Sequence, residues 1–368
     1  MQKSFQNQKS FQNNAPRLAA ALLAAGLSFI AAAAQAQTAA PGYSVTSFGQ
    51  APAGATNPDS IAVSGGDVFI GYANTASKTG AFGTSTIAEF SGSGTLLTTY
   101  TVSGHNDGLK VAPDGTLWSF QNEDGNPNLA IINTVSGTSQ NYSLPSANGG
   151  GIDDVVFLNG KTYFSASNAQ KDPNTDPAIV QATLTNGAFS YQTILAGNAL
   201  ANGGTTQLNL TDADSLTTTL DGSLFLTDQT ANQVITVSNP GSPFQTVSAV
   251  ATSYNGASTD VDDTIFTGGK TGTLLVSDTN SNTIYAISGP FTGSVFSAGP
   301  DTGLVGGLDL TTGDLSPIVT GFAAPKGMAF LPAAAVPEAS TTVSFGLLLM
   351  LGLGGAAVSA KKKAHAAA

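Results

Sequence analysis

Five aspartates stand at equivalent places along the chain, and each leads into a short apolar run. Carboxylate oxygens are hard ligands of the kind that Ca²⁺ or Mg²⁺ prefers in proteins. If the fold brings the five carboxylates together, they form a candidate binding site for such a cation. The other interpretation is structural, with each carboxylate satisfying backbone amides at the start of its strand. The five aspartates are Asp59, Asp107, Asp153, Asp214 and Asp262. His105 lies two residues before Asp107 and is a further candidate for this site.

Catalytic chemistry has little support in the sequence. There is no cysteine, and His105 is the only histidine between residues 37 and 335, so any Ser-His-Asp arrangement would have to use it. No phosphate-binding loop, dinucleotide fingerprint or histidine-based zinc spacing occurs. Paired carboxylates for glycoside hydrolysis stay open, because the sequence does not give their separations. The sequence therefore names no catalytic residue and no certain cofactor, and it favours a binding protein over an enzyme.

The aspartates belong to a repeated unit. In each unit an acid leads into a first apolar strand, and a tight turn with glycine precedes a second one. Asp-Gly and Asn-Gly suit two-residue hairpins, because both central residues of a type I′ turn need positive φ. The turn glycines, which lie 49, 45, 62 and 50 residues apart, are Gly66, Gly115, Gly160, Gly222 and Gly272.

A period in the forties with several strands per unit is typical of a β-propeller blade. Five units and a further opening at 326–330 predict an all-β propeller of six blades, with five or seven as alternatives. The fifth unit is expected to be a hairpin of 264–266 and 274–276. Residues 43–48 are expected to add a strand beside the C-terminal fragment, so that both ends close one blade. A glycine-rich sandwich or a β-solenoid is the main alternative architecture.

Two polar turns carry a resemblance to a known group of propellers. Asp228 and Asn232, and likewise Asp278 and Asn282, lie four residues apart just before a new apolar strand. This spacing resembles NHL-type and gluconolactonase-like propellers over about residues 57–331. The resemblance implies a propeller fold, and lactone-hydrolysing propellers of this kind hold a metal near the channel mouth.

Charge limits the partners. Residues 37–335 contain six lysines and no arginine against 22 acidic residues, a formal net charge of −16. Such a surface repels nucleic acid and lacks the guanidinium groups that bind phosphate. Nucleic acid is therefore excluded as a partner. Without cysteine, the body must be held together by its core or by a metal.

The first 36 residues have the features of a signal peptide. Lys3, Lys9 and Arg17 precede an apolar stretch from 18 to 34, and Ala34-Gln35-Ala36 offers a small-x-small cleavage site. We expect residues 1–36 to be removed on export, which leaves 37–335 as the propeller body. An uncleaved anchor is the alternative.

The last 33 residues, 336–368, read as a sorting tail. The apolar run at 343–360 is long enough to span the bilayer as a transmembrane helix, and basic residues follow it. A short polar motif precedes the run, and the motif and basic residues are Val336, Pro337, Glu338, Lys361, Lys362 and Lys363.

This arrangement resembles the PEP-CTERM sorting signal of Gram-negative bacteria, a tail also called the ice-binding protein C-terminal domain. Ala339 stands where that family usually has a second proline. The resemblance implies an exosortase-like sorting peptidase as partner and a transient anchor in the inner membrane. It also implies a final place at the cell surface or outside the cell, in a matrix rich in exopolysaccharide.

Together these features predict an exported surface or matrix propeller that binds a ligand, with exopolysaccharide as the expected partner. Any cofactor is expected to be Ca²⁺ or Mg²⁺ at the aspartates. The alternative is a secreted metal-dependent hydrolase acting on a lactone or ester.

Overall fold

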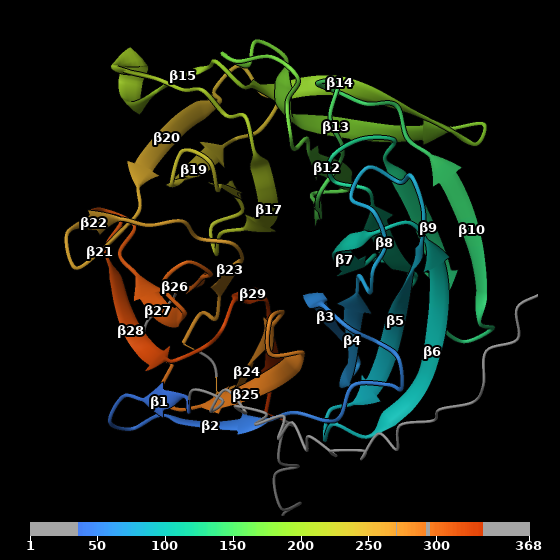
Figure 1. Ribbon diagram of the computed structural model, residues 1–368. Coiled ribbons are helices and arrows are strands. Elements are labelled where there is room, and N and C mark those ends of the chain that lie inside the picture. Colours follow the sequence, from blue (N-terminus) through green and yellow to red (C-terminus); the bar gives the residue numbers. More distant parts are fainter. Residues whose placement is uncertain (1–35, 270, 292–294, 334–368) are drawn as a thin grey trace, which may run out of the picture. The chain divides into compact units, whose positions relative to one another are not determined.

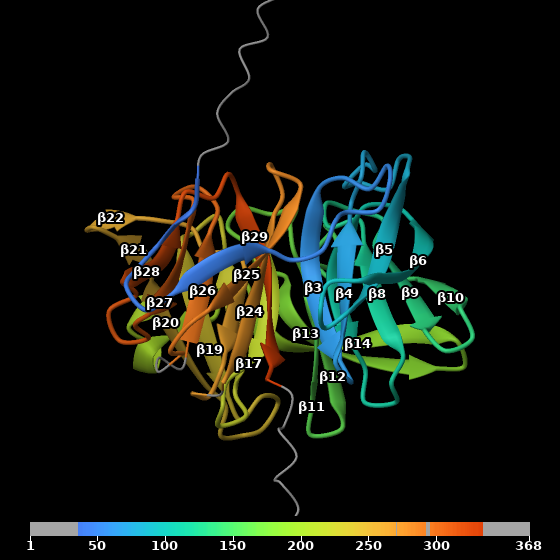
Figure 2. The ribbon, with the colours of Figure 1, turned by 90° about the horizontal axis from the view of Figure 1, so that it is seen from below.

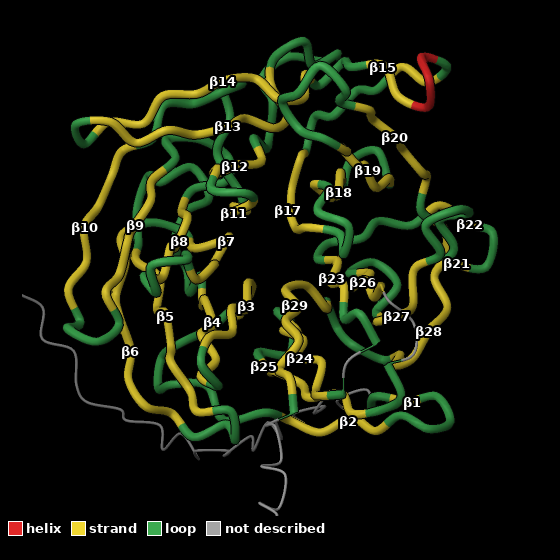
Figure 3. Tube along the Cα trace, turned by 180° about the vertical axis from the view of Figure 1, so that it is seen from behind, coloured by secondary structure: helices red, strands yellow, loops and turns green. Residues whose placement is uncertain are grey.

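A computed structural model describes residues 36–269, 271–291 and 295–333 of the chain. The predicted signal peptide (1–36, except its last residue) and the whole sorting tail (336–368) lie outside these residues. The described part is almost entirely strands and turns, with a single 3₁₀ turn, η1 (Asn202–Gly204), drawn red in Figure 3. It contains no helix of the length and apolarity that a membrane crossing requires.

Six large antiparallel sheets are arranged around a central axis (Figure 1). Neighbouring innermost strands contact one another in a closed circle, in the order β3, β7, β11, β17, β23, β29 and back to β3. This is a six-bladed β-propeller, so the predicted fold class and blade number are confirmed.

The first four blades are each built from four consecutive strands, ordered from the axis outward. Seen from the side, these strands run along the axis and are joined by hairpins at both ends (Figure 2). Blade 1 comprises β3 (Pro58–Ser64), β4 (Asp67–Tyr72), β5 (Thr84–Ser91) and β6 (Leu96–Ser103). Blade 2 comprises β7 (Asn106–Val111), β8 (Leu117–Gln121), β9 (Asn128–Asn133) and β10 (Thr138–Ser143). Blade 3 comprises β11 (Val155–Leu158), β12 (Lys161–Ser165), β13 (Pro177–Thr185) and β14 (Ala188–Ala196). Blade 4 comprises β17 (Ala213–Thr218), β18 (Leu224–Asp228), β19 (Gln233–Ser238) and β20 (Thr246–Ala251).

Blades 5 and 6 are interleaved in sequence, and the predicted fifth hairpin is wrong. Strand β23 pairs with β26, whereas β24 pairs with β25 and β29, so the two strands expected to form one hairpin lie in neighbouring sheets. Blade 5 runs outward as β23 (Thr264–Phe266), β26 (Val295–Gly299), β27 (Leu304–Leu308), β28 (Leu315–Thr320) and β1 (Thr38–Ala39). Blade 6 runs outward as β29 (Pro325–Pro332), β24 (Gly272–Asp278), β25 (Thr283–Ser288) and β2 (Ser44–Ser47).

The two ends of the described chain close the ring together. Strand β2 is the outer edge of blade 6 and β29 is its innermost strand, so both ends complete one blade as expected. The expected place of residues 43–48 beside the C-terminal fragment is wrong, because β2 pairs with β25, and β24 lies between β25 and β29. Strand β1 extends the outer edge of blade 5. Two short hairpins stand apart from the blades, β15 (Leu200–Ala201) with β16 (Thr206–Gln207) and β21 (Ser253–Tyr254) with β22 (Ala257–Ser258).

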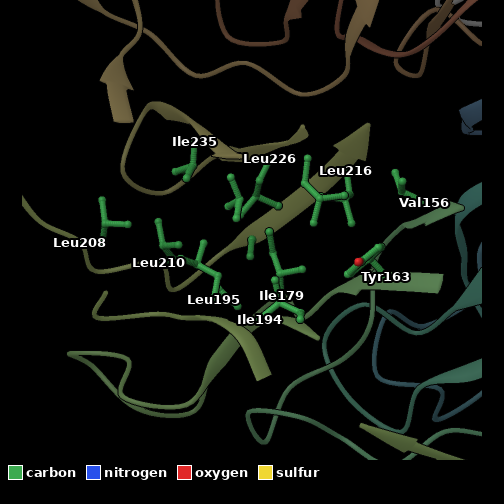
Figure 4. Close-up of a cluster of buried hydrophobic side chains, with 14 of the residues drawn as sticks. Val156, Tyr163, Ile179, Ile194, Leu195, Leu208, Leu210, Leu216, Leu226 and Ile235 are labelled. Carbon is green, nitrogen blue, oxygen red and sulfur yellow. The ribbon is translucent and has the colours of Figure 1, made fainter. Parts of the chain in front are cut away.

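The core lies between the blades. Figure 4 shows one such cluster, in which Tyr163 and Ile179 of blade 3 lie with Leu216, Leu226 and Ile235 of blade 4. Leu216, Leu226, Ile179 and Ile235 are completely buried. Because every blade pair shares such a layer, burial of apolar area holds neighbouring sheets together without disulfides.

The innermost strands approach so closely that two of them need glycine. A Cβ at Gly327 of β29 would lie 2.2 Å from the carbonyl oxygen of Asp59 on β3. A Cβ at Gly108 of β7 would lie 2.1 Å from the carbonyl oxygen of Asp153. Blades 6 and 1, and blades 2 and 3, can therefore meet at the axis only with hydrogen at these positions.

We expect Gly327→Ala to lower the free energy of unfolding by about 1–3 kcal/mol or more, because a methyl group cannot enter a closed contact without moving a strand. Urea unfolding of the full-length chain measures this loss. The matched control is Gly307→Ala, where the nearest atom to a Cβ is 3.9 Å away and φ is not positive. Equal stability of the two variants would contradict the close packing of β29 against β3.

Candidate functional site

The channel mouth is the end of the channel at which the innermost strands begin. Six residues take equivalent places there: Asp59 in β3, Asp107 in β7, Asp153 before β11, Asp214 in β17, Asp262 before β23 and Lys326 in β29. In four of these strands the pairing register shifts at this point. Such a bulge re-aims side chains, and here it falls where the strand meets the channel. The five aspartates are called the acidic ring below.

Lys326 is the internal counterion of the acidic ring. Its Nζ lies 3.4 Å from Oδ2 of Asp59 and 3.3 Å from Oδ2 of Asp262. Gln229 Nε2 donates a further hydrogen bond of 2.7 Å to Asp262 Oδ2. The carboxylates of Asp262 and Asp59 hold the pKa of Lys326 well above its usual value. Lys326, at the sixth equivalent position, therefore joins β29 to blades 1 and 5.

On the other side of the mouth three carboxyl groups converge. One oxygen each of Asp107, Glu123 and Asp153 lies within 4.8 Å of the other two. Asp107 is 6% exposed and shares a side-chain hydrogen bond with Glu123, and its Oδ2 accepts no N–H or hydroxyl group. Two carboxylates about 4 Å apart repel each other by roughly 4 kcal/mol near a protein surface. This cluster must bind protons or a cation.

Glu123 has its own basic neighbours. Lys78 Nζ lies 2.5 Å from Glu123 Oε1, and His105 Nε2 lies 3.6 Å from the same oxygen. His105 Nδ1 faces the carbonyl oxygen of Ala76 at 3.0 Å. Burial alone would raise the pKa of Glu123, but Lys78 and Lys326 outweigh it and hold the pKa at about 2.

Four of the ring carboxyl groups are held toward the protonated form. Burial raises the pKa of Asp59 to about 6, although Lys326 opposes the change. Burial, and next the charges of neighbouring acids, raise the pKa of Asp107, Asp153 and Asp214 well above the usual value. Asp153 and Asp214 also share a side-chain hydrogen bond, which requires a proton on one of them.

A second layer of acids follows directly in sequence, and this layer is satisfied. Asp154 Oδ2 accepts the backbone N–H of Leu216 at 3.1 Å and pairs with Lys110 at 3.0 Å. Asp263 accepts the backbone N–H of Met328 at 2.6 Å and the hydroxyl of Ser215. The structural role considered for the ring aspartates, that of accepting backbone amides at the start of a strand, is therefore filled by Asp154 and Asp263. Further along the channel, Lys110, Ser215 and Asp263 line a cavity of about 250 Å³.

Sequence reasoning placed the acidic ring and His105 at one mouth but missed Glu123 and Lys78. Both lie in loops that join the second and third strands of a blade, after β8 and after β4. The repeat gave no signal for them, because these loops differ in length and composition from blade to blade. The sequence signal that could have pointed to this site is Glu123 itself, because glutamate is rare in residues 37–335 and Glu123 follows an apolar strand.

Neither a protein-family model nor a curated protein matches the chain. Among solved structures it is similar to virginiamycin B lyase from Staphylococcus aureus, at 13% identity over 80% of this chain and 89% of that one, with a TM-score of 0.42. It is also similar to a candidate 6-phosphogluconolactonase from Bacteroides fragilis (13% identity, 80% and 86% covered, TM-score 0.44). A protein from Lactobacillus plantarum gives 16% identity, 75% and 89% coverage and a TM-score of 0.43. Similarity this low carries no information on ligand or activity.

The raised pKa values predict that the chelator-treated protein loses stability as pH rises. A carboxyl group whose pKa is raised by folding stabilises the folded state fully below its unfolded pKa of about 3.9, and this contribution is lost as pH rises through the folded pKa. For Asp59 that value is about 6. Glu123, with its pKa lowered to about 2, acts in the opposite direction but only below about 4.5.

The melting temperature measured in chelator should therefore be higher at pH 5 than at pH 8. Asp214→Asn should flatten the difference, because an amide keeps the hydrogen bond to Asp153 and cannot ionise. Asp67→Asn, at the opposite end of blade 1, is the matched control and should retain it. A melting temperature that rises from pH 5 to pH 8 would contradict the assignment.

Proposed function

We propose that this chain is an exported propeller of the cell surface or extracellular matrix that binds a hydroxyl-rich ligand through a divalent cation at its channel mouth. The observation that carries the proposal is the convergence of Asp107, Glu123 and Asp153, in which the buried Oδ2 of Asp107 accepts no N–H or hydroxyl group. Exopolysaccharide is the proposed partner, because its hydroxyl groups suit such a cation.

The donor set and its spacing favour Ca²⁺. Ca²⁺ takes six to eight oxygen ligands at about 2.3–2.6 Å, so two oxygens on one ion are at most about 5 Å apart. The three carboxyl groups fall within that span at 4.8 Å or less. Mg²⁺ binds at about 2.0–2.1 Å and would need two oxygens on one ion to be no more than about 4.2 Å apart. Three carboxylates leave coordination positions open, and ligand hydroxyls are suited to fill them.

The charge balance adds support. Among the residues that the structure describes, two lysines of the mouth, Lys78 and Lys326, face the five ring aspartates and Glu123. A divalent cation would replace the protons that now keep several of these carboxyl groups neutral. Charges this close and this little exposed are weakly screened by salt.

Delivery to the surface rests on the two ends of the chain. The signal-peptide pattern at 1–36 and the PEP-CTERM-like tail at 336–368 both support export, with an exosortase-like peptidase as the processing partner. The strongly acidic body and the absence of cysteine are compatible with an extracellular site.

Metal-dependent hydrolysis of a lactone or ester is the second candidate. It is favoured by His105, whose ring lies beside Glu123 and is little exposed, so that a base stands next to the proposed cation. Cation-dependent lactone hydrolysis that is lost in His105→Ala, with cation binding retained, would decide for this candidate.

Isothermal titration of the full-length, chelator-treated chain with Ca²⁺ at pH 8 should show one saturable site. Asp107→Asn should weaken binding by about tenfold or more, because it removes one charged ligand from the cluster; 1.4 kcal/mol corresponds to tenfold. Asp67→Asn should bind as the parent does. Equal affinity of the parent and both variants would refute the site, as would no binding at all.

Removal of residues 336–368 should release the protein into the medium without membrane retention, since the apolar run and its basic stop are absent. Fractionation of cells that express the parent and the truncated chain measures this. The matched control replaces Lys161 by alanine, a lysine of the body outside the tail. A membrane-bound pool unchanged by the truncation would count against the sorting proposal.

A further inference from the structure

The two ends of the propeller differ, and the C-terminal strand ends at the one without the acidic ring. Strand β29 carries Lys326 at the channel mouth and runs from there to the opposite end of the molecule (Figure 2). Strand β17 runs the same way from Asp214, so the turn that follows it, 219–222, also lies at the opposite end. This end is called the exit face below, because the described part of the chain ends there at Ala333.

The first turn of blade 4, 219–222, is a neighbour of the end of β29 on the exit face. Leu220 lies beside the turn that joins β23 to β24, since a Cβ at Gly268 would be 3.3 Å from Cδ2 of Leu220. The backbone N–H of Ala333 donates to the carbonyl oxygen of Thr271 in that same turn at 3.1 Å. Leu220 and Ala333 therefore flank one turn.

The second turn of blade 4, residues 239–245, begins next to the first. The hydroxyl oxygens of Ser223 and Ser238 are 2.9 Å apart, which places the starts of the two turns together. Phe244 in the second turn is 79% exposed, and Leu220 in the first is 61% exposed. Two large apolar side chains are therefore presented to solvent on neighbouring turns of one blade.

Hydrogen bonds hold the turn that carries Phe244 in one shape. The backbone N–H of Phe244 donates to Ser242 Oγ at 3.1 Å, and the backbone N–H of Gly241 donates to Gln245 Oε1 at 2.7 Å. Gln245 Nε2 in turn donates to the carbonyl oxygen of Ile194 in blade 3 at 2.8 Å. A side chain presented by so firm a turn loses little conformational entropy when it enters an apolar phase.

The apolar run that is predicted to span the bilayer starts close to the exit face. Ten residue steps separate Ala333 from Val343, the first residue of the run. An extended chain covers at most about 3.6 Å per step, so Ala333 stays within about 36 Å of the start of the run. A tether this short gives a weak contact a high effective concentration.

Charge favours the exit face over the mouth for contact with lipid. The acidic ring and Glu123 lie at the mouth, whereas the two turns of blade 4 contain one charged residue, Asp221. The formal net charge of residues 37–335 is −16, so anionic headgroups repel the body. Contact with a bilayer must therefore rest on apolar side chains.

We propose that the exit face rests on the lipid bilayer while the sorting tail is anchored, with Phe244 and Leu220 inserted at the boundary between headgroups and acyl chains. The inference rests on the proposed function, since the tail supplies the anchor. Aromatic and aliphatic side chains gain stability by burying apolar area at that boundary. The channel mouth then points away from the membrane and is open to ligands outside.

The absence of cysteine allows a direct test, because one introduced cysteine carries a label at a single place. Phe244→Cys is labelled with nitrobenzoxadiazole in the full-length chain, which is reconstituted into phosphatidylcholine vesicles. A lipid with a spin label on its acyl chain should quench this dye by about twofold or more. The matched control is Phe82→Cys, at a 67% exposed phenylalanine in the loop after β4 at the mouth end, where the dye should stay unquenched. Equal quenching at the two positions, or none at Phe244→Cys, would overturn the proposal.

A second pair of variants tests whether Phe244 itself inserts. With the dye at Leu220→Cys, the further change Phe244→Ser should reduce quenching, whereas Phe82→Ser should leave it unchanged. All three side chains are exposed, so these substitutions spare the core. Quenching that Phe244→Ser does not alter would overturn the role of Phe244.

Flotation of the vesicles measures the anchor separately. A chain that does not float would refute the tail as an anchor and the docking with it, whereas a floating chain with an unquenched dye at Phe244→Cys would refute the docking alone. Removal of residues 336–368 should abolish the quenching, and quenching that persists would overturn the role of the tether. A dye that shifts to the blue but is not reached by the spin-labelled lipid would show that protein, such as a second copy of the chain, covers the turn, and would overturn the assignment to lipid.

Discussion

The constraint on which the molecule depends is that like charges cannot gather in a desolvated place without being neutralised. Six strands that begin at one end of a channel bring six equivalent side chains together, and in this chain five of the six are aspartates. The sixth, Lys326, neutralises Asp59 and Asp262 and so fixes the last innermost strand between blades 1 and 5. The remaining carboxyl groups are left to protons, to Lys78 or to a cation.

Two consecutive acids divide structural and functional roles between them. Asp153 and Asp154 are neighbours in sequence, yet Asp154 bonds the backbone of the next blade and a lysine while Asp153 joins the convergent cluster. Asp262 and Asp263 repeat the pattern, with Asp263 bonding the backbone of Met328. In both pairs the second acid, Asp154 or Asp263, bonds the backbone of another blade, while the acid before it belongs to the acidic ring. This rigid layer limits how far the mouth can relax to relieve its own repulsion.

The fold was predictable because each blade obeys local rules that recur. An acid, an apolar strand, a tight turn with glycine and a second strand identified blades 1 to 4 and the equivalent positions of the ring. The interleaving of blades 5 and 6 was not predictable, because β23 and β24 are joined by a glycine-containing segment that resembles a hairpin turn in sequence. Only the non-local pairing of β23 with β26, and of β24 with β29, shows that β23 and β24 belong to neighbouring blades and do not form one hairpin. Glu123 and Lys78 could not be predicted from the repeat either, because they lie in loops whose length differs from blade to blade.

Protons and a divalent cation are two ways of neutralising the carboxyl groups of the channel mouth, and they would compete for the same oxygens. Protons suffice at low pH, where Asp59 and its neighbours are neutral. As the protons leave, the cation that we propose would take their place where Asp107, Glu123 and Asp153 converge.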